Sequence, residues 1–173
     1  SAATAATQLW WVSLALWLLS RVADGLDGSL ARRRRARPPQ DEAGPGDHCG
    51  AGGFLDITAD FIVYGTTVVG VAVGATTGQG APWWPFLLVL LAYYVNGTAF
   101  LAFSSIAERT GHTIEDGRSL SFLGGLAEGT ETIAVHSLWL LLPAIAWQIA
   151  LVWAAVVALS AAQRIVAGYR NLS

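Results

Sequence analysis

The sequence predicts an all-α integral membrane protein, a bundle of transmembrane helices, from its composition, its apolar blocks and its arginine positions. Of the 173 residues, 54% are hydrophobic and only 13% are charged, whereas an ordinary soluble domain carries about 25% charged residues. Five apolar blocks of roughly 20 residues are each long enough to cross about 30 Å of hydrocarbon as a helix. This composition excludes a soluble domain, and no feature favours nucleic acid as a partner.

The apolar blocks are expected at residues 2–23, 54–76, 85–106, 120–142 and 144–166. The first is too long and too rich in tryptophan for a signal-peptide core and has no basic segment before it, so we interpret it as a span. Pro85 stands where a helix can begin, and Pro143 separates the last two blocks. We expect one transmembrane domain over residues 1–173, with residues 33–51 forming a mobile, hydrophilic cytoplasmic loop.

The arginines predict the orientation of the chain, because Lys and Arg accumulate in cytoplasmic loops. All ten arginines lie at the end of the first block or after it, between the third and fourth blocks, or at the end of the fifth block or after it. Residues 76–84 and 142–147, which would lie on the opposite side, carry no charge. The amino end is therefore expected outside and the carboxyl end in the cytoplasm. Arginine without any lysine also favours a GC-rich bacterial source, hence the bacterial inner membrane.

Four aspartates lie where the first two blocks meet the cytoplasm. Asp24 and Asp27 end the first block, while Asp56 and Asp60 fall in the first turns of the second. Residues three or four apart share a helical face, so adjacent helices would bring all four carboxylates into one cavity. All-oxygen ligation suits Mg²⁺, Mn²⁺ or Ca²⁺. The alternative is that these aspartates reach water or pair with the adjacent arginines.

Small residues and an arginine stand at fixed intervals among these aspartates. The first part reads Asp24-Gly-Leu-Asp27-Gly28-Ser-Leu-Ala31-Arg32, and the second reads Gly52-Gly-Phe-Leu-Asp56-Ile-Thr-Ala-Asp60. Together they resemble the signature of class-I CDP-alcohol phosphotransferases, D-x2-D-G-x2-A-R-x8or9-G-x3-D-x3-D, at all eight fixed positions. One departure is that 19 residues separate the two parts, about ten more than in the family. Loops tolerate such length at low cost, so the carboxylate pairs keep their alignment.

The resemblance implies an enzyme that transfers a phosphatidyl group from CDP-diacylglycerol to a small alcohol and releases CMP, in phospholipid biosynthesis. Asp24, Asp27 and Asp56 would hold one or, more in keeping with the family, two Mg²⁺ or Mn²⁺ ions. Asp60 would be a further metal ligand or the catalytic base that deprotonates the acceptor hydroxyl. Such a carboxylate cluster supplies the charge neutralisation and oriented nucleophile that displacement at a pyrophosphate requires.

The remaining signature positions would bind the CDP donor. Gly28, Ala31 and Gly52 would let the cytidine approach the helix backbones, and Arg32 would complement phosphate charge. The alternative for the three small residues is close helix packing, which is common in membranes. The family has six spanning helices and forms homodimers among membrane lipids, and its signature begins at the end of the second helix. We therefore expect the first helix to be missing from this chain.

Three further residues are candidates for binding the acceptor. Glu128 and Glu131 stand three apart in the fourth block, with His136 nearby, and Arg164 lies in the fifth. The glutamates could line the acceptor pocket, or instead form interhelical hydrogen bonds or pair with Arg109, Arg118 or Arg164. Arg164 could bind an anionic group of the acceptor, or anchor the helix at the cytoplasmic face. The strings around these residues are similar to a branch of bacterial inner-membrane members of the family.

Two other functions stay open at this stage. Within the same chemistry, the enzyme could transfer a phospho-alcohol from its CDP derivative to a lipid hydroxyl. In a different class, the four aspartates could form the transport site of a divalent-cation carrier. A carrier does not require the pattern of small residues and arginine around the carboxylates, so the phosphatidyltransferase is the preferred hypothesis.

Overall fold

The computed structural model describes residues 1–35, 48–111 and 129–172, with the side chains of 26–35 and 48–51 left out. These residues form helices joined by short turns, and no strand occurs among them. The elements are α1 (Ala2–Ala6), α2 (Trp10–Arg35), α3 (His48–Gln79), α4 (Trp84–Thr110), α5 (Gly129–Leu141), the 3₁₀ turn η1 (Pro143–Ile145) and α6 (Ala146–Leu172). The all-helical fold predicted from the sequence is confirmed.

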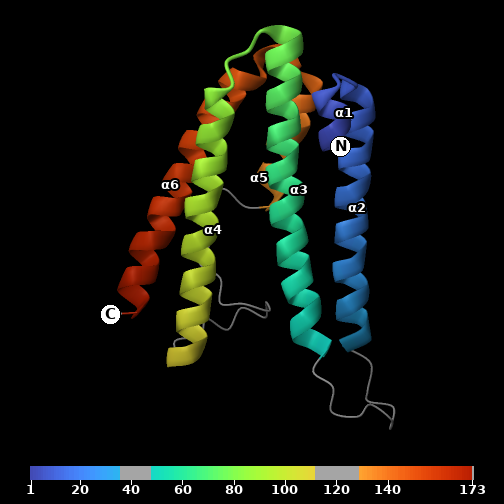
Figure 1. The fold of residues 1–173 in the computed structure, drawn as a ribbon. Helices are drawn as coiled ribbons and strands as arrows, with labels where there is room; N and C mark the ends of the chain where they lie inside the picture. Colours follow the sequence, from blue (N-terminus) through green and yellow to red (C-terminus); the bar gives the residue numbers. More distant parts are fainter. Residues whose placement is uncertain (36–47, 112–128, 173) are drawn as a thin grey trace.

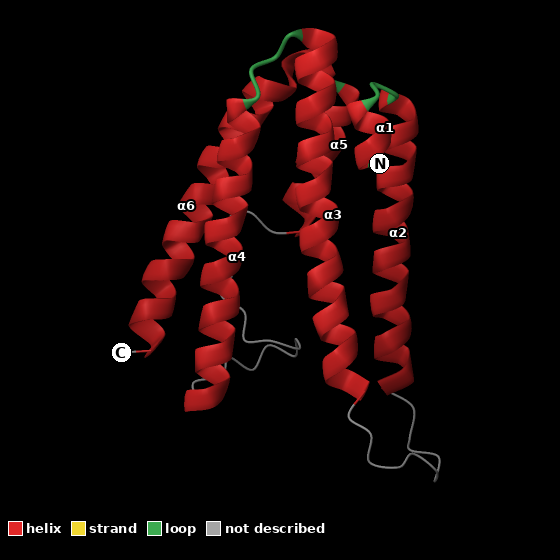
Figure 2. Ribbon diagram, viewed as in Figure 1, coloured by secondary structure: helices red, strands yellow, loops and turns green. Residues whose placement is uncertain are grey.

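The long helices run alternately in opposite directions, so that the arginine-bearing ends meet at one end of the bundle. Figure 1 shows the carboxyl ends of α2, α4 and α6 at the same end as the amino end of α3. Arg109 and Arg170 lie in the last turns of α4 and α6. Figure 2 shows that short loops join the helices at the opposite end. This arrangement matches the alternation expected from the arginines.

By length and composition, three described helical stretches could cross a membrane: Gly52–Gln79, Trp84–Thr110 and Pro143–Leu172. They correspond to the second, third and fifth predicted blocks. The described part of the fourth block, α5, has 13 residues and so rises about 20 Å; residues 120–128 lie outside the described chain. Large apolar side chains are exposed over the outer surface of the bundle, as expected where a helix faces lipid rather than water.

The first predicted block, residues 2–23, is wrong as a single helix. The chain breaks after α1 at Gln8, which has a positive φ of 63°, and α2 starts at Trp10. The break lets α1 pack on α3, where Gly70 and Gly74 offer no side chain: a Cβ at either position would collide with the backbone of Ala2 or Ala5. Close approach at small residues is a common mode of helix packing in membranes.

The predicted loop at residues 33–51 is also wrong at both of its ends. Helix α2 continues through Arg35, and α3 begins at His48. Arginine is a good helix former, so the polar composition that predicted a loop does not end α2. The remainder, residues 36–47, lies outside the described chain.

The core between the helices is built mainly from aromatic and small residues. Trp17, Phe86 and Trp139 are fully buried there, and alanines of α6 pack against them. The polar side chains described next lie beside this core, toward the end of the bundle that carries the arginines.

Candidate active site

Asp24 of α2 and Asp60 of α3 meet at one guanidinium group, that of Arg21. The Nη1 atom of Arg21 donates a hydrogen bond to Asp60 Oδ1 at 2.8 Å and lies 3.6 Å from Asp24 Oδ2. The side chain of Arg21 is only 8% exposed, against 41% for Asp24 and 37% for Asp60. The two helices therefore bring two signature carboxylates to one buried positive charge. Asp24 and Asp60 both pair with an adjacent arginine, which is the alternative to metal binding that the sequence left open.

Two aromatic rings enclose the same guanidinium group. The Cζ atom of Arg21 lies 5.3 Å from the ring centre of Trp17 and 5.1 Å from that of Tyr64, distances at which cation–π attraction operates. Nη1 also donates to the hydroxyl oxygen of Tyr64 at 3.3 Å. Arg21 is thus fixed by contacts on both α2 and α3.

The other signature positions are described in part. Asp56 is exposed, one turn before Asp60 on α3. A Cβ added at Gly52 would meet no described atom within 4 Å, so none of the described residues packs closely on this glycine. The side chains of Asp27, Gly28, Ala31 and Arg32 lie outside the described residues, although their backbone belongs to α2.

The donor set fits a hard divalent cation in its chemistry, since every candidate ligand is a carboxylate. The Nη1 atom of Arg21 is a stand-in cation, and its position shows that Asp24 and Asp60 can share one positive charge. Among the described side chains, no three His, Cys, Asp or Glu residues converge on one point. A complete ligand set would therefore need Asp27, which the described side chains do not include, and a movement of Asp56 or its neighbours.

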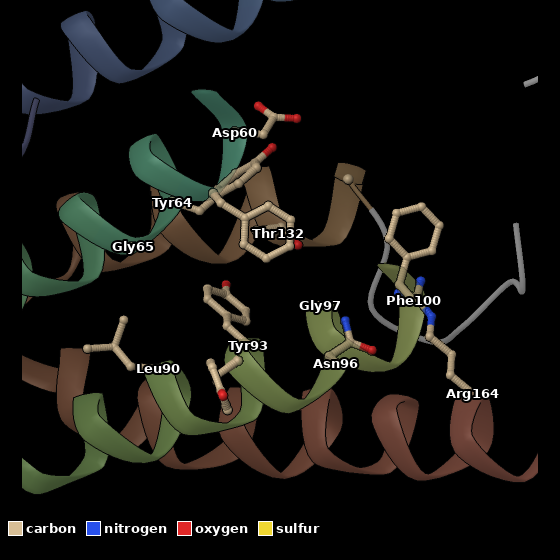
Figure 3. A pocket seen from close by; sticks show the side chains of 13 residues that line it. Asp60, Tyr64, Gly65, Leu90, Tyr93, Asn96, Gly97, Phe100, Thr132 and Arg164 are labelled. Atoms are coloured by element: carbon tan, nitrogen blue, oxygen red, sulfur yellow. The ribbon is translucent and has the colours of Figure 1, made fainter. Parts of the chain in front are cut away.

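A cavity of about 420 Å³ adjoins Asp60 between α3, α4, α5 and α6, which is within the usual size range of small-molecule sites. Figure 3 shows Asp60 and Tyr64 on one wall, Tyr93 and Asn96 on the facing wall, and Arg164 at the far end beside Phe100. Most of the wall is apolar or aromatic. The polar side chains that line the cavity are Asp60, Tyr64, Tyr93, Tyr94, Asn96, Thr132 and Arg164.

Of the three acceptor candidates, the structure places Arg164 in this cavity wall. Arg164 is 7% exposed, and its Cζ atom lies 5.7 Å from the ring centre of Phe100. Glu131 is exposed, accepts a hydrogen bond from Thr130 at 3.2 Å, and does not line the cavity. The adjacent Thr132 lines it instead, because one residue along a helix turns the side chain by about 100°. Glu128 lies outside the described residues.

Sequence reasoning missed a hydrogen-bond chain beside the cavity. Trp153 of α6 donates to the Tyr93 hydroxyl oxygen at 2.7 Å, and that hydroxyl lies 3.0 Å from His136 Nε2. His136 is fully buried and stacks on Trp17, with ring centres 4.9 Å apart. Tyr, Trp and His inside apolar blocks could have indicated these hydrogen bonds, because each polar tip needs a partner there.

Comparison with known proteins gives one clear relative. The chain is 38% identical over 141 residues to inner membrane protein YnjF of Escherichia coli (strain K12). The match covers 78% of this chain and 60% of YnjF, so the chain spans less than two thirds of the length of that relative. Together with the apolar helices, this match decides the location. The chain is a bacterial inner-membrane protein. No family model matches it, and no solved structure matches it.

Proposed function

We propose that the chain is a metal-dependent CDP-alcohol phosphatidyltransferase, with its site facing the cytoplasm. It would transfer a phosphatidyl group from CDP-diacylglycerol to a small alcohol that carries an anionic group. The observation that carries the proposal is the cavity of about 420 Å³ that has the signature residue Asp60 and the buried Arg164 in its wall. One cavity thus offers a base for a hydroxyl and a cation for an anion.

In this reaction the acceptor oxygen attacks the β-phosphorus of the donor and forms a new P–O bond. The P–O bond to the CMP moiety breaks, CMP leaves with the electron pair, and the acceptor proton passes to Asp60. Arg21 contacts Oδ1 of Asp60, so Oδ2 is the atom assigned to take the proton. When bound to Asp24, Asp27 and Asp56, Mg²⁺ or Mn²⁺ would neutralise charge on the diphosphate.

The chain's own residues divide the two substrates between two regions. Gly52, where an added Cβ would meet no described atom within 4 Å, is assigned with Gly28, Ala31 and Arg32 to the cytidine diphosphate. The acceptor is assigned to the side of Asp60 that faces the cavity. There Asn96 has its Oδ1 atom buried without a hydrogen-bond partner among the described residues, and an acceptor hydroxyl could satisfy it. A direct displacement requires the acceptor oxygen and the departing CMP on opposite sides of the β-phosphorus, and two adjoining binding regions can hold the substrates in that order.

The test uses the full-length protein in detergent with CDP-diacylglycerol and Mn²⁺. Paired alcohols, each with and without a phosphate group, are supplied one at a time, and CMP release and new lipids are measured by mass spectrometry. We expect metal-dependent CMP release and a new lipid only with a phosphorylated member of a pair. Absence of CMP release with every alcohol would contradict the proposal. Transfer from a CDP-alcohol to diacylglycerol would favour the runner-up reaction, and Mn²⁺ transport into vesicles without CMP release would favour a carrier.

A further inference from the structure

Among the described side chains at the junction of α2 and α3, Arg21 is the most enclosed charged group, yet it is not one of the eight signature positions. Its side chain is 8% exposed, and its Nη1 atom contacts Asp60 and Asp24. No step of the proposed reaction uses this residue. Its position between an assigned metal ligand, Asp24, and the assigned base, Asp60, therefore calls for a separate explanation.

We propose that Arg21 is a built-in counter-cation that holds Asp24 and Asp60 before the metal binds and then opposes metal binding at Asp24. It is a positioning residue, since it acts through the two carboxylates. This inference rests on the proposed function, because it takes Asp24 as a metal ligand and Asp60 as the base beside it. Its consequence is that Arg21 weakens metal affinity while it stabilises the metal-free protein.

Electrostatics gives both parts of this effect. Without a cation, carboxylates gathered at one place repel each other, and a guanidinium at 2.8 Å from one of them offsets that repulsion. When a divalent cation binds Asp24, the guanidinium would be a like charge a few ångströms away and would disfavour binding. Arg21 therefore stabilises the metal-free carboxylate cluster and opposes metal binding to it.

The aromatic rings explain how the guanidinium can release the carboxylates and yet stay buried. An unpaired buried charge is costly, but Trp17 and Tyr64 hold the Arg21 Cζ atom at 5.3 Å and 5.1 Å from their ring centres. These contacts do not depend on the aspartates, so the positive charge would keep favourable neighbours when Asp24 binds a metal. A planar guanidinium suits this place better than an ammonium, because it can stack on a ring and bridge two carboxylates at once.

The experiment compares Mn²⁺ binding, without any substrate, to the wild-type protein and to Arg21→Gln in detergent. Affinity is measured by electron paramagnetic resonance of free Mn²⁺, and melting temperature is followed over a Mn²⁺ titration. We expect Arg21→Gln to melt at a lower temperature without metal but to bind Mn²⁺ about tenfold more tightly. The difference in melting temperature should shrink as Mn²⁺ rises. Arg170→Gln is the matched control: it removes one exposed arginine of α6 and should change neither quantity.

Each other result is decisive. A lower melting temperature with unchanged Mn²⁺ affinity would make Arg21 merely structural, and weaker affinity would mean that Arg21 assists the metal. Either result overturns the inference and leaves the proposed function standing. Absence of Mn²⁺ binding by the wild type would overturn the metal-dependent function as well. Should Arg21→Gln not fold, Arg21→Lys gives the answer: its ammonium reaches one carboxylate, so its Mn²⁺ affinity should exceed that of the wild type, and an equal affinity would overturn the inference.

Discussion

Tyr93 of α4 and His136 of α5 share a hydrogen bond of 3.0 Å beside the cavity. The indole of Trp153 can only donate, and it donates to the same Tyr93 oxygen. Three helices are thereby joined through one hydroxyl group, and that hydroxyl belongs to a residue of the cavity wall.

Removal of this hydroxyl should destabilise the bundle. In Tyr93→Phe, the Trp153 indole and His136 Nε2 both lose their partner, and each unsatisfied buried group costs about 1–3 kcal/mol. Thermal or denaturant unfolding in detergent measures the loss. Tyr94→Phe is the control, because Tyr94 is the next residue and is 71% exposed. If the two variants unfold alike, the hydrogen-bond chain does not hold the helices together.

The packing of α1 on α3 should depend on the absence of a side chain at Gly74. A Cβ there would collide with the Ala5 carbonyl and approach the Trp10 ring at 2.7 Å, so Gly74→Ala should cost about 1–3 kcal/mol of stability. Gly25→Ala is a matched control, since a Cβ at Gly25 meets no described atom within 4 Å and alanine favours a helix. Equal melting temperatures for the two variants would show that α1 does not rest on this surface.

The sequence predicted the helical class and most spans, because apolar length and arginine placement report directly on the membrane. It did not predict the break at Gln8, since composition alone carries no information about which partner a helix meets. Glycines at positions 70, 74 and 78 do recur every four residues, a spacing that permits close approach and could have indicated a docking helix. The hydropathy of a segment indicates whether lipid or water surrounds it, whereas a row of glycines along one helix face indicates where another helix packs.

The candidate site was predictable to the extent that it follows from spacing along one helix. Asp24 and Asp60, on two helices, both reach the guanidinium of Arg21, whereas the expected meeting of all four aspartates in one cavity stays a prediction. That Arg21 lies between them was not predicted, because the partner of a charge depends on the rotation of one helix against another. For the same reason the sequence could not choose between Glu131 and its neighbour Thr132 as a residue of the cavity wall.

Asp56 and Asp60 should differ in the kinetic step that each supports. Asp56→Asn removes a proposed metal ligand and should abolish CMP release. Asp60→Asn should slow the chemical step by about 10² or more if Asp60 is the base, while metal-dependent donor binding is retained. Single-turnover kinetics and CMP-dependent thermal stabilisation separate the two effects. Equal loss of donor binding in both variants would assign Asp60 to the metal instead.

The last prediction concerns the anionic group of the acceptor. Arg164 is buried in the cavity wall, so Arg164→Gln removes the cation assigned to that group and should raise the KM of a phosphorylated acceptor about tenfold or more. A hydrogen bond to a charged group is worth about 1.5–3 kcal/mol, which corresponds to a change of this size. The KM of CDP-diacylglycerol should stay unchanged, because the donor is assigned to the opposite side of Asp60. Glu131→Gln is the control: the exposed carboxylate of Glu131, in the first turn of α5, lies outside the cavity wall, so neither KM should change. A shift in the acceptor KM with Glu131→Gln, and none with Arg164→Gln, would reverse the assignment and move the acceptor to the other face of α5.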